Sequence, residues 1–401
     1  MKVLIADRFE KVGVDGLKEL GCTVVSQPDV DAGELPALIR QVDPHVLIVR
    51  GKRVTADSLK AGRALTLVIR AGAGIDTIDV ATASSIGVFV SNCPGKNSIA
   101  VAELVMGLLL ACDRRIPDQV GDLRQGRWQK GEYSRARGLY GRTLGIVGLG
   151  QIGREIASRA KAFGMRVVAW SRNLTYEEAE RLGVAYAQTP IEVARLSDAV
   201  SINVAANPET KHLVDAEFLA AMRPGAYLIN TSRGSVVDED ALKRAIEEKG
   251  IRGGLDVFQN EPAGPTADFT TAIAQSPGVY GTHHVGASTD QAQVAIAHEV
   301  IRIVQAFQAT GEVPNVVNRL ARSSATHVLS IRHRNRPGVL AHVFAVLAGV
   351  AINVEEVENI IYHGAQATLA RIHLDGEPNH GVLDRIRTGN PDIISVELSE
   401  L

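Results

Sequence analysis

The sequence lacks several features that would point to particular classes of protein. It has only three cysteines, Cys22, Cys93 and Cys112, and their spacing matches no metal-binding pattern, so no metal site is expected. They are predicted to be reduced core thiols, which suits a cytoplasmic protein. The net charge is −2, so nothing favours nucleic acid or an anionic membrane as a partner. No apolar run is long enough to span a bilayer, and Met1–Asp7 is predicted to begin a strand rather than a targeting segment.

What is present is an alternation of short apolar runs with helical patterns. Such alternation is typical of an α/β protein with doubly wound parallel sheets. The 401 residues, 45% of them hydrophobic, suffice for two or three domains. Two long apolar helices are predicted at 97–113 and 288–309. The predicted strands are Val3–Ala6, Cys22–Ser26, Val46–Val49, Leu65–Ile69 and Val88–Val90, then Leu144–Val147, Met165–Trp170, Ala199–Val204, Ala226–Asn230 and Gly253–Val257.

The strongest local signal is a glycine-rich turn in the middle of the chain. Gly148, Gly150 and Gly153 have the spacing G-x-G-x-x-G, between an apolar run and a helical pattern at 151–163. Gly148 permits a tight turn, Gly150 lets a pyrophosphate approach the backbone, and Gly153 lets the helix pack closely on the strand. The N-terminus of the helix adds free N–H groups and a partial positive charge. This context predicts a dinucleotide site of the Rossmann type, and the alternative is a packing turn in an unrelated α/β sheet.

After His327 the pattern of the sequence changes. The elements predicted for 327–401 follow the order β-α-β-β-α-β, which is typical of a small ferredoxin-like unit. The polar, weakly patterned segment 318–326 is interpreted as a linker. The predicted strands are Val328–Arg332, Ile352–Ile361, Ala365–Leu374 and Ile393–Leu398, with helices at 338–347 and 381–387.

Further motifs follow one another along the chain, and together with the glycine-rich turn they carry a family resemblance. They are Arg-Ala-Gly-Ala-Gly-Ile-Asp at 70–76, Asn-Cys-Pro-Gly-Lys-Asn-Ser at 92–98, Asn-Thr-Ser-Arg-Gly at 230–234, Leu-Asp-Val-Phe at 255–258 with Glu261-Pro262, and His-His-Val-Gly-Ala-Ser-Thr at 283–289. With them the sequence resembles the D-isomer-specific 2-hydroxyacid dehydrogenases, of the type that ends in a regulatory ACT domain. The resemblance implies a substrate domain of 1–96 plus 283–317, a dinucleotide-binding domain of 97–282 and an ACT domain of 327–401.

The resemblance assigns the acid–base chemistry to three residues. Hydride transfer from a secondary alcohol to a nicotinamide leaves a proton to be removed, and histidine suits that step. The resemblance implies that His284 takes the proton, that Glu261 orients His284 and stabilises the imidazolium, and that Arg233 holds the substrate carboxylate. His283 stands where the family usually has proline, so an exchanged role for His283 stays open. A glutamate at 261 argues against the formate dehydrogenase branch.

The resemblance also implies substrate contacts outside this set. A basic run after the strand 46–49 would bind a substrate phosphate, and its alternative is a solvated surface charge run. Backbone N–H groups in the 70–76 motif would meet the carboxylate. Asn97 would line the site, and its alternative role is to cap the helix that follows. The substrate-contacting residues are therefore predicted to be Arg50, Lys52, Arg53, Ala73, Gly74 and Asn97, with Arg233 and His284.

The expected cofactor is NAD, with NADP possible. NAD-using members of the family have an aspartate at the end of the second strand of this domain, where this chain has Ser171. Ser171 cannot repel a 2′-phosphate and Arg172 could pair with one, or Arg172 points to solvent and NAD remains the main cofactor. The predicted cofactor contacts are Gly148, Gly150, Gln151, Ile152, Gly153, Ser171, Arg172, Val204, Thr231, Ser232, Arg233, Asp256, His284, Gly286 and Ala287.

In the C-terminal unit the resemblance points to an effector site. In serine-sensitive members, residues at the positions of His333, Asn335 and Asn353 hold L-serine between two paired ACT domains. One histidine and two asparagines suit a zwitterionic hydroxy amino acid. The alternative is that the three residues only form turns and caps in a dimerising module.

These features predict a cytoplasmic homodimer or homotetramer that acts on a small phosphorylated hydroxy acid. The predicted reaction is oxidation of D-3-phosphoglycerate to 3-phosphooxypyruvate, the entry step of L-serine synthesis. A glyoxylate or hydroxypyruvate reductase on the same scaffold is the alternative enzyme. A nucleotide-sensing regulator is the alternative from another class, and the set of Arg233, Glu261 and His284 argues against it.

Overall fold

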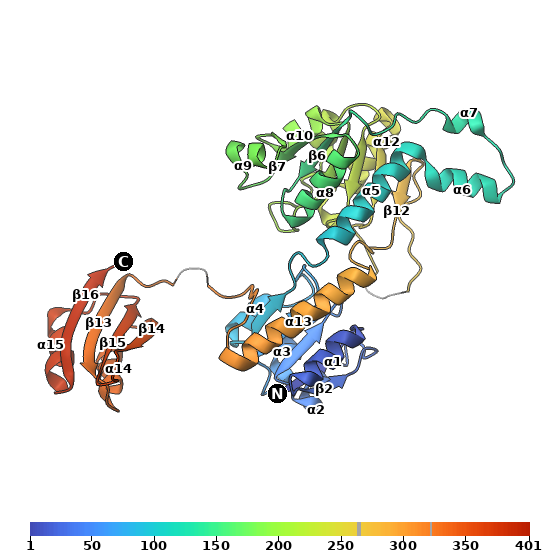
Figure 1. Cartoon of the computed structure of the whole chain (residues 1–401). Coiled ribbons are helices and arrows are strands. Elements are labelled where there is room, and N and C mark those ends of the chain that lie inside the picture. The colour runs from blue at the N-terminus through green and yellow to red at the C-terminus, as the bar shows by residue number, and fades with distance from the viewer. Residues whose placement is uncertain (263–265, 321–322) are drawn as a thin grey trace. The chain divides into compact units, whose positions relative to one another are not determined.

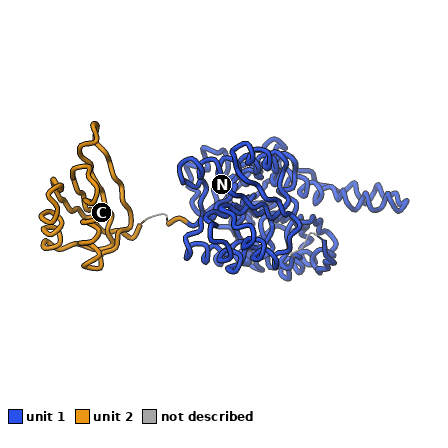
Figure 2. The backbone as a smooth tube through the Cα atoms, turned by 90° about the horizontal axis from the view of Figure 1, so that it is seen from below, with its two compact units in different colours: residues 1–318 blue, residues 319–401 orange. Residues whose placement is uncertain are grey.

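The structure, a computed structural model, describes residues 1–262, 266–320 and 323–401, which form two compact units (Figures 1 and 2). The first unit, Met1–Asn318, holds two parallel sheets, and the second, Arg319–Leu401, holds one antiparallel sheet. In the described part of the chain, no helix combines the length and the apolar character that crossing a membrane requires.

The first sheet of the first unit has five parallel strands in the order β2-β1-β3-β4-β5. One face packs on α1 (Lys11–Glu19) and α13 (Asp290–Thr310), and the other on α2 (Leu35–Val42), α3 (Ala56–Ala61) and α4 (Val80–Ser85). Because both faces are covered, the central strand β3 is buried along its whole length. The strands are β1 (Lys2–Ile5), β2 (Thr23–Ser26), β3 (Val46–Val49), β4 (Leu67–Arg70) and β5 (Phe89–Asn92).

The second sheet has seven parallel strands in the order β12-β11-β10-β9-β6-β7-β8. The strand order reverses between β6 and β9, which creates the switch point where ligands bind in sheets of this kind. The strands are β6 (Thr143–Val147), β7 (Arg166–Trp170), β8 (Ala185–Tyr186), β9 (Ala199–Ile202), β10 (Tyr227–Asn230), β11 (Arg252–Leu255) and β12 (Val279–Gly281).

Helices cover both faces of this second sheet as well. Side chains of α5 (Ser98–Arg114), α8 (Gln151–Ala162) and α9 (Tyr176–Arg181) share one core with it. Side chains of α10 (Pro190–Leu196), α11 (Ala216–Ala221) and α12 (Glu239–Lys249) form the other core. The two doubly wound parallel sheets that the sequence predicted are therefore confirmed.

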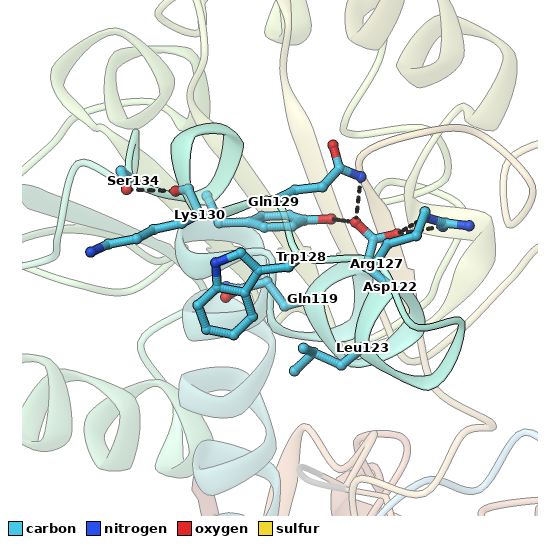
Figure 3. Close-up of a pocket in the computed structure, with 9 residues that line it drawn as sticks. Gln119, Asp122, Leu123, Arg127, Trp128, Gln129, Lys130 and Ser134 are labelled. Atoms are coloured by element: carbon cyan, nitrogen blue, oxygen red, sulfur yellow. Dashed lines mark hydrogen bonds and ion pairs between the residues drawn. The ribbon is translucent and has the colours of Figure 1, made fainter.

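An arm formed by α6 (Ile116–Arg124) and α7 (Lys130–Tyr133) projects from the rest of the first unit (Figure 1). No helix was predicted from the sequence in this segment. Asp122 organises the arm, because its carboxylate accepts hydrogen bonds from Tyr133, Gln129 and Arg127. Figure 3 shows this network beside a pocket that Trp128 also lines.

The second unit has the predicted β-α-β-β-α-β order. Its sheet is antiparallel with the strand order β14-β15-β13-β16, and α14 and α15 share a core with it. This is the ferredoxin-like arrangement. The elements are β13 (His327–Arg334), α14 (Val339–Ala348), β14 (Val354–Ile361), β15 (Ala367–Leu374), α15 (His380–Gly389) and β16 (Ile393–Glu400).

Several predicted element ends differ from the structure, and two of these differences matter most for the site. The strand predicted at Gly253–Val257 ends at Leu255, so Asp256 lies in the loop that follows. The helix predicted from 288 begins at Asp290, because Thr289 caps it by accepting a hydrogen bond from the amide of Ala292. Ser288 is thereby left in the loop that carries His284.

Candidate active site

The predicted site residues of the first unit follow the carboxyl ends of strands in both sheets. Arg50 follows β3, and the 70–76 motif begins at the end of β4. In the seven-stranded sheet the glycine-rich turn follows β6, and Val204, Thr231 and Asp256 come after β9, β10 and β11. Parallel sheets bind their ligands at this edge because loops from several strands meet there.

The three glycines of the turn have different surroundings. Gly148 has a φ of 98°, and an added Cβ would lie 2.7 Å from the carbonyl oxygen of Asn203 in the loop after β9. A Cβ at Gly153 would lie 2.3 Å from the carbonyl oxygen of Gly148. At Gly150, by contrast, a Cβ would meet no atom within 4 Å. Packing therefore requires the outer two glycines, while the middle one faces open space that a diphosphate could fill.

Two further observations fit a nicotinamide dinucleotide. The N-terminus of α8 carries no side-chain cap, so no capping side chain occupies the N–H groups of its first turn. The hydroxyl of Thr231 is buried and has no hydrogen-bond partner among the described residues. Asn230 fixes the turn that holds Thr231, because its side chain accepts from the amide of Ser232 at 3.0 Å and donates to the carbonyl of Arg233.

His284 and Glu261 form a close pair. Nδ1 of His284 lies 2.6 Å from Oε2 of Glu261, whose other oxygen accepts the amide of Phe258 at 2.8 Å. Burial works against ionisation of Glu261, but the bonds from His284 and Phe258 outweigh it and lower the pKa of the carboxyl. The His284 side chain is 46% exposed, so its ring is accessible from outside. His283 is exposed beside it.

The backbone of the His284 loop is held by Asp256. His284 has a φ of 53°, a conformation that side chains other than glycine rarely adopt, and its amide donates to the carbonyl of Asp256. The buried Asp256 carboxylate accepts from the hydroxyl of Thr282 and from the amides of Val285 and Gly286, at 2.7–2.9 Å. The Asp256 carboxylate therefore holds the loop that carries His284, and the predicted contact of Asp256 with the cofactor stays a prediction.

Arg233 is held by the loop that follows β4. Its Nε lies 2.8 Å from Oδ2 of Asp76, and its Nη1 donates to the carbonyl of Ser232 at 2.8 Å. A Cβ at Gly74 would lie 2.1 Å from Nη2 of Arg233, so the guanidinium rests on the glycine backbone. Gly234 is required as glycine, because a Cβ there would lie 2.0 Å from the carbonyl of Phe258.

Arg70 also lies in this site, although the sequence analysis did not select it. A Cβ at Gly72 would lie 1.6 Å from Nη1 of Arg70, and Nε of Arg70 is buried with no partner among the described residues. Burial, and then the positive charges of Arg233 and Arg50, lower the pKa of Arg70. The available signal was its position as the first residue of the 70–76 motif, at the end of a buried strand.

Only one member of the predicted basic run is placed against the site. Asp7 accepts the amides of Arg50, Gly51 and Lys52, and so fixes the loop. Nη2 of Arg50 then reaches Oγ of Ser288 at 3.3 Å, in the loop that carries His284. Lys52 instead donates to the carbonyls of Pro28 and Val30, and Arg53 is exposed. Of the three predicted phosphate ligands, Arg50 is therefore the one that reaches the His284 loop, and substrate contact by Lys52 and Arg53 stays a prediction.

Asn97 and Gln151 lie where the chain enters α5 and α8. Asn97 occupies the N-cap position of α5, but its side chain makes no capping hydrogen bond, and its Oδ1 is buried without a partner among the described residues. This geometry favours a site role over the capping alternative. Gln151 packs on Gly95, where a Cβ would lie 1.7 Å from its Oε1.

The remaining predicted contacts make backbone hydrogen bonds, pack against the core or lie at the surface. The carbonyl oxygen of Ala73 accepts from Asn92, and that of Ala287 accepts from Gln293. Ile152 packs partly buried against the core. Ser171 follows β7, and Nη1 of Arg172 lies 3.6 Å from Oε2 of Glu209 with both side chains at least 75% exposed. Arg172 is therefore paired with a carboxylate at the surface.

The structure does not gather the three predicted effector residues in one chain. The His333 side chain is buried, with Nε2 2.7 Å from Oγ1 of Thr368 and Nδ1 2.8 Å from the carbonyl of Arg334. Asn335 donates to the carbonyl of Ala365, beyond one end of β15. The backbone amide of Asn353 donates to the carboxylate of Asp375, beyond the other end of β15. The two asparagines thus lie at opposite ends of the sheet.

Comparison with known proteins identifies the family. Residues 106–286 match the profile of "D-isomer specific 2-hydroxyacid dehydrogenase, NAD binding domain". D-3-phosphoglycerate dehydrogenase of Methanocaldococcus jannaschii is 37% identical over 79% of this chain, which spans 59% of that protein. Hydroxypyruvate reductase of Thermotoga maritima is 36% identical over 75% of this chain and 96% of its own length.

A solved structure agrees with these matches. The NADPH-dependent glyoxylate/hydroxypyruvate reductase of Sinorhizobium meliloti, in complex with NADP and malonate, superposes with a TM-score of 0.68 at 32% identity, covering 80% of this chain and 99% of that one. Similarity of this extent, with His284, Glu261 and Arg233 at the strand ends, is more than a shared fold. The chain belongs to the family of nicotinamide-dependent D-isomer-specific 2-hydroxyacid dehydrogenases.

Proposed function

We propose that this enzyme oxidises D-3-phosphoglycerate to 3-phosphooxypyruvate, the reaction that begins L-serine synthesis. The observation that carries the proposal is the arginine cluster, defined as Arg50, Arg70 and Arg233. The positive charges of Arg233 and Arg50 contribute, after burial, to lowering the pKa of Arg70, and Asp76 is the carboxylate paired with Arg233. One guanidinium suffices for a substrate carboxylate, so the excess of positive charge favours a substrate with a second anionic group.

In this proposal the chain's own residues handle the proton and the carboxylate. When bound, the nicotinamide accepts the hydride from the carbon that bears the substrate hydroxyl. Nδ1 of His284 is engaged by Glu261, so Nε2 is the nitrogen left to take the hydroxyl proton. The Glu261 carboxylate then stabilises the imidazolium that forms. Arg233 holds the substrate carboxylate and polarises the reacting oxygen.

The runner-up is a hydroxypyruvate or glyoxylate reductase. Two observations favour it: Lys52 is turned away from the site, and the Thermotoga maritima relative is matched over 96% of its length. The jannaschii relative is much longer than this chain. A reductase of this kind would need Arg233 but would gain little from Arg50 and Arg70.

A panel of substrates separates the two proposals. We expect kcat/KM for 3-phosphooxypyruvate to exceed that for hydroxypyruvate and glyoxylate by at least ~10²-fold, about 3 kcal/mol. The stereochemical control is run in the oxidation direction with NAD, where L-lactate should not react. Equal or higher kcat/KM with the phosphate-free keto acids would make the reductase the correct assignment.

We further propose that the enzyme uses NAD and also turns over NADPH detectably. Ser171 offers no carboxylate to repel a 2′-phosphate, but the pairing of Arg172 with Glu209 limits what Arg172 can add. Glu209→Gln should therefore lower KM for NADPH and leave KM for NADH nearly unchanged, whereas Ser171→Asp should abolish NADPH use. A preference of the wild type for NADH above ~10³-fold, about 4 kcal/mol, would contradict the relaxed specificity.

We propose that a second copy of the chain covers the exposed apolar face of α6. Ile116, Val120 and Leu123 recur at helical spacing on one side of α6 and are exposed, and Trp128 beside them is 79% exposed. Leu123→Glu should shift the molar mass in sedimentation equilibrium toward that of a monomer. The surface change Gln125→Glu on the same arm is the control, and an unchanged mass for Leu123→Glu would refute this interface.

An L-serine site at the second unit is proposed only across two copies, because Asn335 and Asn353 lie at opposite ends of the sheet in one chain. The β14 strand between them in the sequence is a sheet edge, with Val357 and Ile361 exposed. Antiparallel pairing of two such edges would bring Asn335 of one copy toward Asn353 of the other. The test is titration with L-serine and with glycine: no change in rate or melting temperature up to millimolar serine would leave only a pairing role.

A further inference from the structure

Asp76 and Arg233 join the two sheets of the first unit at the substrate site. Asp76 lies in the loop after β4 of the five-stranded sheet, and Arg233 follows β10 of the seven-stranded sheet. The contact has two bonds, from Nε to Oδ2 at 2.8 Å and from Nη2 to Oδ1 at 3.4 Å. The carboxylate therefore occupies one particular edge of the guanidinium, the edge formed by Nε and Nη2.

The remaining donors of Arg233 match the needs of a substrate carboxylate. A guanidinium carries five N–H bonds, and Asp76 takes two of them, one on Nε and one on Nη2. The carbonyl of Ser232 takes a third, on Nη1. With respect to the described residues, one N–H bond is left on each terminal nitrogen, and a bidentate carboxylate can accept from such a pair.

The same loop also limits the position of the guanidinium through Gly74. The backbone of Gly74 lies so close to Nη2 that any side chain there would collide with it. The two bonds to Asp76 thus fix the orientation of the guanidinium plane, and the close approach of Gly74 limits the position of Nη2. Asp76 stays ionised near neutral pH, because hydrogen bonding and charge from Arg233 outweigh burial and lower the pKa of the carboxyl.

We propose that Asp76 is the positioning residue for Arg233: it binds the Nε–Nη2 edge so that the two free N–H bonds face the substrate carboxylate. The proposal rests on the role of Arg233 in binding the substrate, and it applies to any 2-hydroxy acid, phosphorylated or not. Without Asp76 the cluster keeps its positive charge, so an anionic substrate still binds. It binds in the wrong orientation, however, and misplacement by about 1 Å can cost ~10²-fold in rate.

The test is the kinetics of Asp76→Asn, with and without Arg233→Lys, in the full-length enzyme with its nicotinamide. We expect Asp76→Asn to lower kcat by ~10–10²-fold while KM for the hydroxy acid changes by less than about threefold and KM for the nicotinamide is unchanged. Asp76→Glu should recover part of kcat. In the Arg233→Lys background the further loss from Asp76→Asn should fall below about threefold, because there is no guanidinium left to orient.

The matched control is Asp79→Asn in the same loop. Asp79 caps α4 by accepting from the amide of Thr82, a role that asparagine also fills, so wild-type kinetics are expected. If Asp76→Asn leaves kcat within twofold, or loses as much in the Arg233→Lys background as in the wild type, the positioning role is wrong. If Arg233→Lys itself keeps wild-type kcat/KM, the substrate-binding role of Arg233 fails instead, which is a separate result.

Discussion

Two histidines, His284 in the first unit and His333 in the second, were both predicted to contact small molecules, and the structure gives them opposite surroundings. His284 is about half exposed, in a loop with positive φ, with a carboxylate 2.6 Å from Nδ1 and no hydrogen-bond partner for Nε2 among the residues that the structure describes. The His333 side chain is buried between a hydroxyl and a backbone carbonyl, which engage both nitrogens. A motif histidine is thus an acid–base candidate only where a charged partner and a free nitrogen coincide.

The largest effect is expected from removing the exposed histidine. His284→Ala should lower turnover by ~10²–10⁴-fold, because proton transfer is lost. Cofactor binding should remain nearly intact, since the glycine-rich turn is untouched, and fluorescence titration with NADH measures it. His283→Ala is the neighbouring control, with a change below about threefold expected. Ordinary turnover in His284→Ala would make His283 the next candidate.

Removing only the charge of its partner should have a smaller effect. Glu261→Gln keeps the shape of the side chain but removes the carboxylate that stabilises the imidazolium, so kcat should fall by ~10–10³-fold. The loss should affect substrates of every size equally, which a comparison of 3-phosphooxypyruvate with hydroxypyruvate measures. A loss confined to one substrate would show that Glu261 acts on binding rather than on the proton.

The buried histidine should act on stability instead of turnover. His333→Ala removes the partner of the buried Thr368 hydroxyl and leaves a cavity, so the second unit should lose ~1–3 kcal/mol of unfolding free energy in urea. Saturating kcat should stay within about twofold, since Arg334 and Thr368, to which His333 is hydrogen-bonded, both belong to the second unit. A large loss of kcat in a folded His333→Ala protein would show that His333 has more than a structural role.

Glu299, a buried carboxylate of the first unit, tests whether a buried ionisable group outside the acid–base pair affects stability rather than turnover. Glu299 accepts from Arg302, Asn315 and Lys96, and these bonds, with the hydrogen bond from Arg302 the largest, lower its pKa to about 2. Because the folded pKa lies below the unfolded value of 4.5, the contribution is present above pH 4.5 and is lost as pH falls toward 2.

Glu299→Gln should therefore lower the unfolding free energy by up to about 3 kcal/mol at neutral pH, and by progressively less below pH 4.5. Urea unfolding at several pH values measures this. The control is Glu103→Gln, whose 60% exposed carboxylate pairs weakly with Arg159 and should cost less than about 0.5 kcal/mol. A deficit that grows on acidification would contradict the assigned sign.

The parallel sheets and the glycine-rich turn were predictable because each rests on a local pattern. Apolar runs alternating with helical periods predicted the strands, and the spacing of Gly148 and Gly153 follows from close backbone packing. A few neighbouring residues decide these features. The pairing of His284 with Glu261, 23 residues apart in the sequence, was instead predicted from the family resemblance.

What the sequence did not predict depends on contacts between distant segments. Arg70 joins Arg50 and Arg233 because β3, β4 and β10 end near one another; its place at the start of the 70–76 motif was a signal, but it did not show which side chains Arg70 would meet. Lys52 was expected in the site because it adjoins Arg50, but the carbonyls of Pro28 and Val30 hold it elsewhere. Side-chain direction within a run of like charges is settled by tertiary structure.

The most direct test of the proposed substrate is the ratio of kcat/KM for 3-phosphooxypyruvate to that for hydroxypyruvate, in the wild type, Arg70→Gln and Arg50→Gln. Using a ratio cancels any general loss of folded enzyme. If the arginine cluster binds a substrate phosphate, the ratio should be high in the wild type and should fall by ~10–10²-fold in each variant, about 1.4–3 kcal/mol. A ratio near one in the wild type, or one that neither variant changes, would contradict the account.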